Sequence, residues 1–115
     1  MVELFGVASY DVDGVRIFVL RGELDASTCR GLAEHLIGPS GSLIVVDLCQ
    51  VTFIDSSGLG AIHAARQMAI KNGGALVVCR PRPMVHRVLE LTGLDMWLTD
   101  WDPDWSNGSA VGCAP

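Results

Sequence analysis

Two adjacent hydroxyl groups stand beside a carboxylate near the middle of the chain, in the run Asp55-Ser56-Ser57-Gly58. The run follows a strongly apolar segment and opens a segment with helical periodicity, so we expect it at a helix N-terminus. Oxygen-bearing side chains are favoured there because they accept hydrogen bonds from backbone N–H groups that lack a partner within the helix. These N–H groups and the helix dipole also favour added negative charge. A serine here can therefore cap the helix, bind an anion or carry a phosphate.

Phosphorylation is the alternative with the largest consequence for the surface. A phosphoserine adds about −1.5 to −2 charges and three acceptor oxygens. At Ser57 the helix start would accept that charge, whereas Asp55 would repel it, as would Asp25 if its strand ends alongside. Such a phosphate would change the surface and leave the fold intact. Local chemistry alone favours neither this switch nor simple capping by both serines.

Other kinds of site are less well supported by the residues. Ser57, Asp55 and His63 are the residue types of a catalytic triad, but the GxSxG spacing is missing and His63 lies well along the expected helix. The Gly58-Leu59-Gly60 run lacks the third glycine of a dinucleotide motif, and no Walker lysine follows it. The three histidines are widely separated. We therefore expect no catalytic residue, no metal and no cofactor.

The amino-acid composition and the net charge exclude several classes of protein. The chain has 115 residues, 50% of them hydrophobic, and a formal net charge of −5, which together predict one globular domain. A nucleic-acid surface would need a basic stripe, and anionic lipid attracts basic segments, so we expect neither direct nucleic-acid contact nor membrane insertion. No signal segment opens the chain and no apolar run approaches ~20 residues. These features predict a cytoplasmic protein, and its four dispersed cysteines are expected to be reduced thiols.

Hydrophobic periodicity predicts an α/β fold. Strands at 4–10 and 15–20 are expected to form an N-terminal hairpin around a turn at 11–14, followed by a helix with apolar residues at 29, 32, 33 and 36. Continuous apolar runs at 43–48 and 75–79 predict buried parallel strands. The helix expected between them, at 58–71, makes this a right-handed crossover.

The C-terminal part of the chain divides into two. A last helix is expected to start near Pro83 and to end at Gly93, with a short strand at 97–99. Residues 100–115 differ in character, since they hold three Asp and two Trp. We expect a domain at 1–99 and an acidic, Trp-containing tail at 100–115 that lies on the domain or is partly disordered.

Several motifs, in this order and spacing, resemble the STAS domain of bacterial anti-sigma factor antagonists. The matching segments are GELD at 22–25, VVDLCQVTFIDSSGLGAI at 45–62, NGGALVVC at 72–79 and VLELTGL at 88–94. The resemblance runs from about Leu4 to Leu98, and its DSSGLG segment is the most specific part. It implies a mixed β-sheet of four to five strands flanked by helices, with an N-terminal hairpin.

The resemblance also implies a partner-switching function. In that family the unphosphorylated antagonist binds an anti-sigma factor, which is itself a serine kinase, and so frees a sigma factor. The kinase phosphorylates the serine at the helix start, the antagonist is released, and a serine phosphatase resets it. The second serine of DSSG corresponds to Ser57. The implied partner-binding residues are Asp25, Asp55, Ser56, Ser57, Gly58 and Leu59.

A second hypothesis comes from the breadth of the same family. STAS domains also serve as appendages of anion transporters, as subunits of lipid-transport systems and as stress-sensing scaffolds. This chain could therefore be a subunit or scaffold of a larger complex in which Ser57 is never modified. A neighbouring gene for an ATP-binding serine kinase would favour the switch, and neighbouring transporter genes would favour the subunit.

Overall fold

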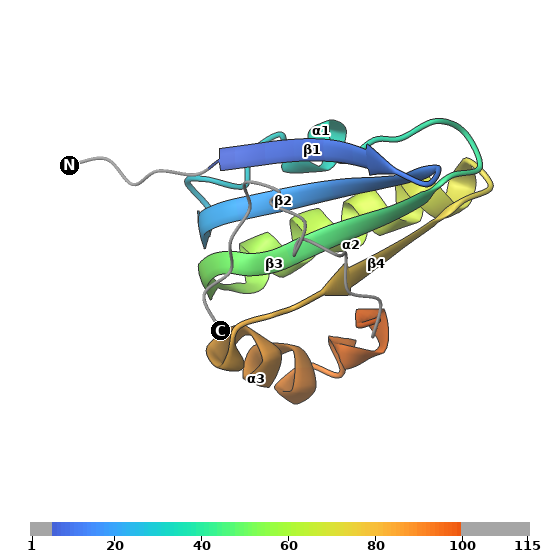
Figure 1. Ribbon diagram of the computed structural model, residues 1–115. Coiled ribbons are helices and arrows are strands. Elements are labelled where there is room, and N and C mark those ends of the chain that lie inside the picture. Colours follow the sequence, from blue (N-terminus) through green and yellow to red (C-terminus); the bar gives the residue numbers. More distant parts are fainter. Residues whose placement is uncertain (1–5, 100–115) are drawn as a thin grey trace.

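The chain folds as a four-stranded mixed sheet with helices packed on it (Figure 1). The computed structural model describes residues 6–99; residues 1–5 and 100–115 lie outside the described part. In chain order the elements are β1 (Gly6–Val12), β2 (Val15–Leu24), α1 (Leu32–His35), β3 (Leu43–Ile54), α2 (Ser56–Lys71), β4 (Ala75–Cys79), α3 (Pro83–Leu91) and the 3₁₀ helix η1 (Leu94–Trp97). The expected fold class is confirmed.

The sheet has the order β1-β2-β3-β4. β1 pairs antiparallel with β2, and β2, β3 and β4 run parallel to one another. The hairpin turn is only two residues long, because Val12 already pairs with Val15. Asp13 and Gly14 both have positive φ, 52° and 80°, which is the conformation that lets a two-residue turn follow the twist of its strands.

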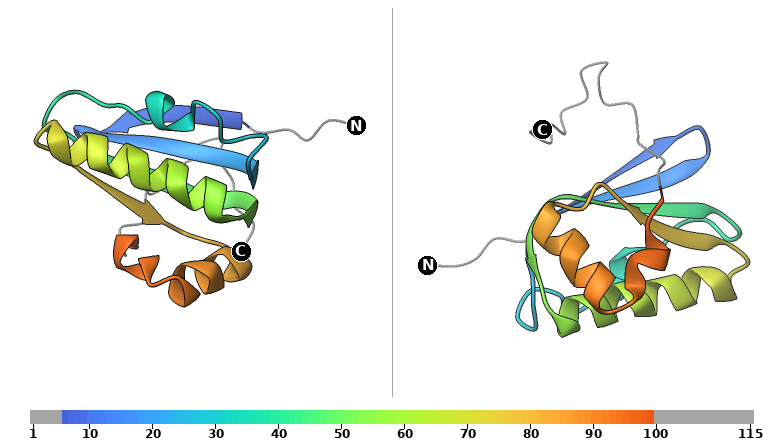
Figure 2. Two further views of the ribbon diagram at one scale, coloured as in Figure 1. Left: turned by 180° about the vertical axis from the view of Figure 1, so that it is seen from behind. Right: turned by 90° about the horizontal axis from the view of Figure 1, so that it is seen from below.

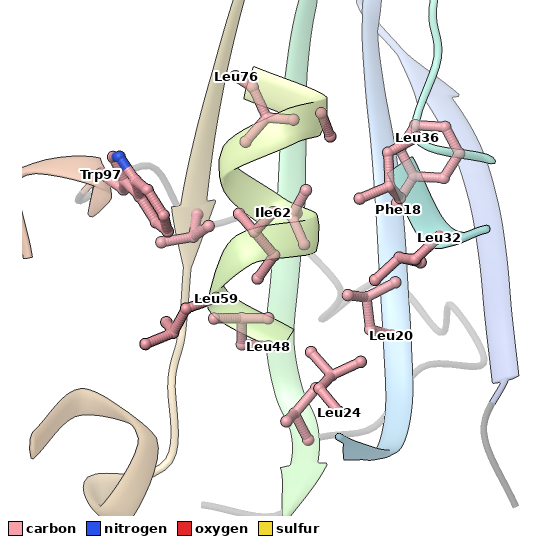
Figure 3. Packing of buried hydrophobic residues seen from close by; sticks show 14 of the residues in the cluster. Phe18, Leu20, Leu24, Leu32, Leu36, Leu48, Leu59, Ile62, Leu76 and Trp97 are labelled. Atoms are coloured by element: carbon pink, nitrogen blue, oxygen red, sulfur yellow. The ribbon is translucent and has the colours of Figure 1, made fainter. Parts of the chain in front are cut away.

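All the described helices pack on one face of the sheet (Figure 2). Side chains of β2 and β3 alternate between the two faces, so Phe18, Leu20 and Leu48 reach the helices. Ile62 of α2 and Trp97 of η1 meet them in one buried cluster (Figure 3). This apolar layer provides the main hydrophobic contribution to stability, and it holds α2 against β2 and β3.

Helix α2 is attached at its C-terminal end to the loop before β3. The N–H of Gly41 donates to the carbonyl oxygen of Asn72 over 2.9 Å, and the N–H of Ala75 donates to that of Ser42 over 3.2 Å. A Cβ atom on Gly74 would lie 2.1 Å from the Ser42 carbonyl oxygen. Only glycine permits this approach.

Strand β3 corrects the sequence prediction, which ended it at Leu48. It continues to Ile54 because its pairing with β2 resumes after a register shift, from Arg21 with Gln50 to Leu24 with Ile54. The strand also accommodates a carboxylate inside the sheet. Asp47 is fully buried and accepts a hydrogen bond from Nε of Arg80 over 3.1 Å. A paired buried carboxylate avoids the cost of an isolated charge.

Three further expectations are corrected. Helix α1 is only four residues long, because Gly31 before it adopts a left-handed conformation with φ of 76°. The strand expected at 97–99 is a single parallel bridge between Val78 and Leu98, after the 3₁₀ helix. Cys49, expected to be reduced, is disulfide-bonded.

Candidate functional site

The residues singled out by the sequence meet where β2 and β3 end. Leu24 and Ile54, the last residues of these parallel strands, are register partners. Asp25 and Asp55 follow them directly, so the two carboxylates leave the sheet side by side. The N–H of Asp55 also donates to the Leu24 carbonyl oxygen over 3.2 Å. We call the surface formed by Asp25 and residues 55–58 the Ser57 edge.

Asp55 caps helix α2. Its Oδ1 accepts hydrogen bonds from the N–H groups of Ser57 (2.9 Å) and Gly58 (3.2 Å), as an N-cap residue in extended conformation does. The sequence left open that the serines cap the helix, with Ser56 better placed for it than Ser57, and this is wrong because Asp55 is the cap. Ser56 is exposed and Ser57 is half-buried in the first turn of the helix. The cap places a carboxylate next to the serine that the motif singles out.

Asp25 is held rigidly at the start of its own turn. Its Oδ1 accepts hydrogen bonds from the hydroxyl of Ser27 (2.8 Å), the N–H of Ser27 (2.9 Å) and the N–H of Thr28 (3.1 Å). The hydroxyl of Ser27 is the main cause that lowers the pKa of Asp25, and the other bonds act in the same direction. Asp25 is therefore an anion at neutral pH, fixed in position at the end of β2.

Gly58 brings the start of α2 into contact with the end of β2. A Cβ atom at this position would lie 2.5 Å from the Leu24 carbonyl oxygen and 2.7 Å from the Leu24 Cβ. The close approach requires glycine, because a real Cβ would displace the backbone of either element. The glycine that looked like part of a phosphate loop is a packing residue.

The apolar side chains next to the Ser57 edge differ from the expectation. Leu59, one of the implied partner-binding residues, is only 8% exposed and belongs to the core, so the contact area expected from Leu59 or an exposed apolar neighbour would have to come from the neighbour. Phe53, the register partner of Glu23 two residues before Asp55, is 40% exposed. Sequence reasoning allowed for an exposed apolar neighbour of Leu59 but did not name Phe53, although a large aromatic side chain beside a run of polar residues is visible in the motif.

The remaining candidates lie away from the Ser57 edge or serve the structure. The ring of His63 stacks on Trp97, with centroids 6.2 Å apart. Arg80 follows β4, which pairs with β3 only as far as Asp47, so it sits well back from Asp55. Arg82 donates to the Cys49 carbonyl oxygen over 2.8 Å. Within residues 6–99 no group of three His, Cys, Asp or Glu side chains could hold a metal ion, and no helix has the length and apolar character needed to cross a bilayer.

Curated relatives match most of this chain. It is 38% identical over 85 residues to an anti-sigma F factor antagonist of Paenibacillus polymyxa, covering 70% of this chain and 73% of the relative. It is 33% identical over 87 residues to an anti-sigma-B factor antagonist of Listeria monocytogenes, covering 73% and 75%.

Solved structures show the same fold. An anti-sigma factor antagonist from Mycobacterium paratuberculosis superposes with a TM-score of 0.75 at 28% identity, covering 90% of this chain and 92% of that one. Unphosphorylated SpoIIAA gives a TM-score of 0.70 at 21% identity, with coverage of 90% and 93%. Phosphorylated SpoIIAA, from Bacillus, gives 0.64 at 20%, with coverage of 90% and 96%. The family model of the STAS domain matches residues 7–103, and the chain belongs to the STAS domain family.

Proposed function

We propose that this protein is an anti-sigma factor antagonist, switched by phosphorylation of Ser57. Its unphosphorylated form binds an anti-sigma factor with serine kinase activity and so releases a sigma factor. The observation that carries the proposal is the placement of Ser57 in the first turn of α2, with Asp55 bonded to its N–H and Asp25 at the adjacent strand end. The curated relatives carry the antagonist name.

Charge is the means of switching in this proposal. A phosphate on Ser57 would be favoured by the N-terminus of α2, worth roughly 0.3–1 kcal/mol, and opposed by the neighbouring Asp55 carboxylate. The two effects nearly cancel, so the free energy of unfolding changes little. In a complex the same phosphate would be desolvated next to two carboxylates. An uncompensated charge in an interface costs several kcal/mol, which is enough to release the partner.

The protein acts by binding in this proposal, and no catalytic group of its own takes part. The anti-sigma factor supplies the kinase activity, and a separate serine phosphatase removes the phosphate. Such a cycle operates in the cytoplasm, where sigma factors meet RNA polymerase. We place the functional domain at residues 1–99.

A capture experiment tests the proposal. Immobilised unmodified protein is used to bind its partner from a lysate of the source organism, and ATP with Mg²⁺ is then added. We expect the partner to be a serine kinase, to be released by ATP, and to leave phosphate on Ser57 by peptide mapping. The Ser56→Ala variant should behave like the wild type, and Ser57→Ala should retain its partner in ATP. Label on Ser56 would overturn the assignment of the phosphate to Ser57, and an unlabelled wild type that retains its partner in ATP would favour the unmodified subunit.

A melting experiment tests the claim that the phosphate acts at the surface. The phosphorylated protein should unfold cooperatively, within a few degrees of the unmodified form, because the local effects oppose each other. A loss of more than about 2 kcal/mol in the free energy of unfolding would mean that the phosphate disrupts the fold, and the surface account would be abandoned.

A further inference from the structure

Helix α3 turns large apolar side chains towards the solvent. Val85 and Leu89, one turn apart, are buried in the core, whereas Met84 and Leu91 on the outer side of the helix have exposed fractions of 46% and 71%. Figure 1 shows α3 at the lower margin of the molecule, with no other described element beyond it. The outward face of a surface helix normally carries polar residues, so exposed apolar side chains in a row indicate a contact surface.

The same outer face carries two opposite charges that do not pair with each other. Arg87 is three residues after Met84 and four before Leu91, so it stands between them on the helix surface. Within the described part of the chain it has no hydrogen-bond or ion-pair partner. Glu90, three residues further on, is also exposed, and only its Oε2 has a neighbour, Nδ1 of His86 at 3.6 Å. Both Arg87 and Glu90 are therefore available to a partner.

These positions complement one another when two copies of α3 pack antiparallel. A two-fold axis beside Val88 reverses the order of the positions, as in every isologous contact. Met84 of one copy then lies level with Leu91 of the other to within one residue, about 1.5 Å along the helix. The same offset brings Arg87 of one copy beside Glu90 of the other. The axis repeats each contact, so two apolar contacts and two ion pairs form together.

We propose that α3 is the contact surface of a homodimer, in which two copies pack this helix antiparallel with Arg87–Glu90 ion pairs on both sides of the axis. The second copy is the occupant because the charges on the helix are complementary to their own reversed order. The outer face of a nine-residue helix is a small surface, which places the dimer among weak and reversible complexes. The contact uses no residue of the Ser57 edge, and it does not depend on the proposed function.

Sedimentation equilibrium of the full chain tests the dimer. We expect a reversible monomer–dimer equilibrium between micromolar and millimolar protein at physiological salt, which screens the repulsion between two chains of net charge −5. Leu91→Ser should weaken the dimer about tenfold or more, since each copy loses an apolar contact. Ile70→Ser is the matched control, at a side chain 46% exposed on α2, and should dimerise like the wild type. A wild type that stays monomeric at millimolar protein, or equal weakening by both variants, would overturn the proposal.

Charge exchange tests the antiparallel pairing. Arg87→Glu and Glu90→Arg should each weaken the homodimer about 5- to 30-fold, because each places two pairs of like charges across the axis. An equimolar mixture of the two variants should restore a dimer, because opposite charges then meet at both sites. Arg30→Glu and Glu34→Arg make the same exchange at α1 and should leave the dimer unchanged. A mixture that dimerises no better than either variant alone would overturn the proposed geometry, and so would a dimer that tolerates both exchanges at α3.

Methionine methyl NMR locates the contact on the surface. On dilution of the wild type through the monomer–dimer equilibrium, the methyl signal of Met84 should shift. Met68 is the matched control, because it is 36% exposed on α2, and its signal should stay in place. A shift of Met68 without one of Met84 would place the contact on another face and overturn the assignment to α3.

Discussion

The backbone N–H of Asp55 donates a hydrogen bond to the carbonyl oxygen of Leu24 over 3.2 Å, joining the first residue after β3 to the last residue of β2. The same carbonyl oxygen is the nearest atom to the position that a Cβ on Gly58 would occupy. The turn that starts at Asp25 and the start of α2 are therefore built on one shared contact. A substitution on either side of this contact should therefore alter the backbone position on the other side.

Gly58→Ala should destabilise the protein by about 1–3 kcal/mol, because the added methyl group would overlap the backbone of Leu24. Gly60→Ala is the matched control in the same helix. It has open space at its Cβ position, so it should gain about 0.5–1 kcal/mol from higher helix propensity. Urea unfolding of the two variants measures both effects. Equal effects would mean that the close contact at Gly58 does not exist in solution.

Asp55→Ala should cost about 0.5–2 kcal/mol, because two N–H groups of α2 lose their acceptor. Asp55→Asn should recover most of this loss, since an amide oxygen can still accept both bonds. Ser56→Ala, at an exposed residue beside the cap, should stay within about 0.5 kcal/mol of the wild type. Thermal unfolding distinguishes the three. A cost at Ser56 equal to that at Asp55 would restore the original assignment of the cap.

Ser27→Ala should raise the pKa of Asp25 towards its ordinary value of 3.8, because the Ser27 hydroxyl bond is the main cause that lowers it. A lowered folded-state pKa stabilises the fold above the unfolded-state value of about 3.9, and that stabilisation is lost as pH falls through the folded-state value. Carboxyl NMR titration measures the pKa directly. Ser40→Ala, whose hydroxyl bonds the Asn72 carbonyl oxygen instead, should leave the pKa of Asp25 unchanged. An unchanged titration in Ser27→Ala would contradict the assigned cause.

Asp25→Asn should slow association with the anti-sigma factor and weaken its salt dependence, because a fixed carboxylate at the Ser57 edge attracts a basic partner surface. Asp11→Asn removes the same charge at the opposite end of β2, where Asp11 pairs with Arg16. It should leave the association rate nearly unchanged. Stopped-flow binding at two ionic strengths compares the two variants. Equal slowing would indicate an effect of net charge, and stronger loss in Arg82→Ala would place the interface near α3.

Phe53→Ala should weaken partner binding by roughly 10- to 100-fold with little change in stability, because exposed aromatic residues at the centre of an interface contribute strongly to affinity. Ile70→Ala is the control, since Ile70 is 46% exposed near the other end of α2. Isothermal titration calorimetry gives both affinities. A normal affinity for Phe53→Ala would exclude this side chain from the contact surface.

Elements with strong periodicity could be predicted from the sequence, and those shaped by tertiary contacts could not. β4 was predicted with its observed ends, since Ala75–Cys79 is a continuous apolar run before a proline. β3 was predicted too short because the continuous apolar run ends at Leu48, whereas its pairing with β2 goes on to Ile54 across register shifts that leave no mark in the sequence. Helix α1 was predicted too long because a positive φ at Gly31 leaves no mark in the apolar pattern.

The site could be located from the sequence but not assigned atom by atom. The DSSG motif and the parallel crossover predict that Asp25 and Asp55 lie together, and the register of Leu24 with Ile54 agrees. The choice of Asp55 as the cap depends on where the first turn of α2 begins. The burial of Leu59 depends on how closely the start of α2 packs against β2. Both are set by the contact of Gly58 with Leu24, which has no local signature.

Helix α2 is clamped at both ends by glycines that admit no side chain, Gly58 against Leu24 and Gly74 against Ser42. Because both ends of α2 are held in this way, the helix cannot slide or tilt on the sheet without breaking both of these close contacts. A modification near the first turn of α2 therefore should not shift the helix, and the rest of the fold should stay unchanged. Crystal forms with and without such a modification should be isomorphous. Selection can then alter the exposed side chains for new partners while the packing between helix and sheet stays the same.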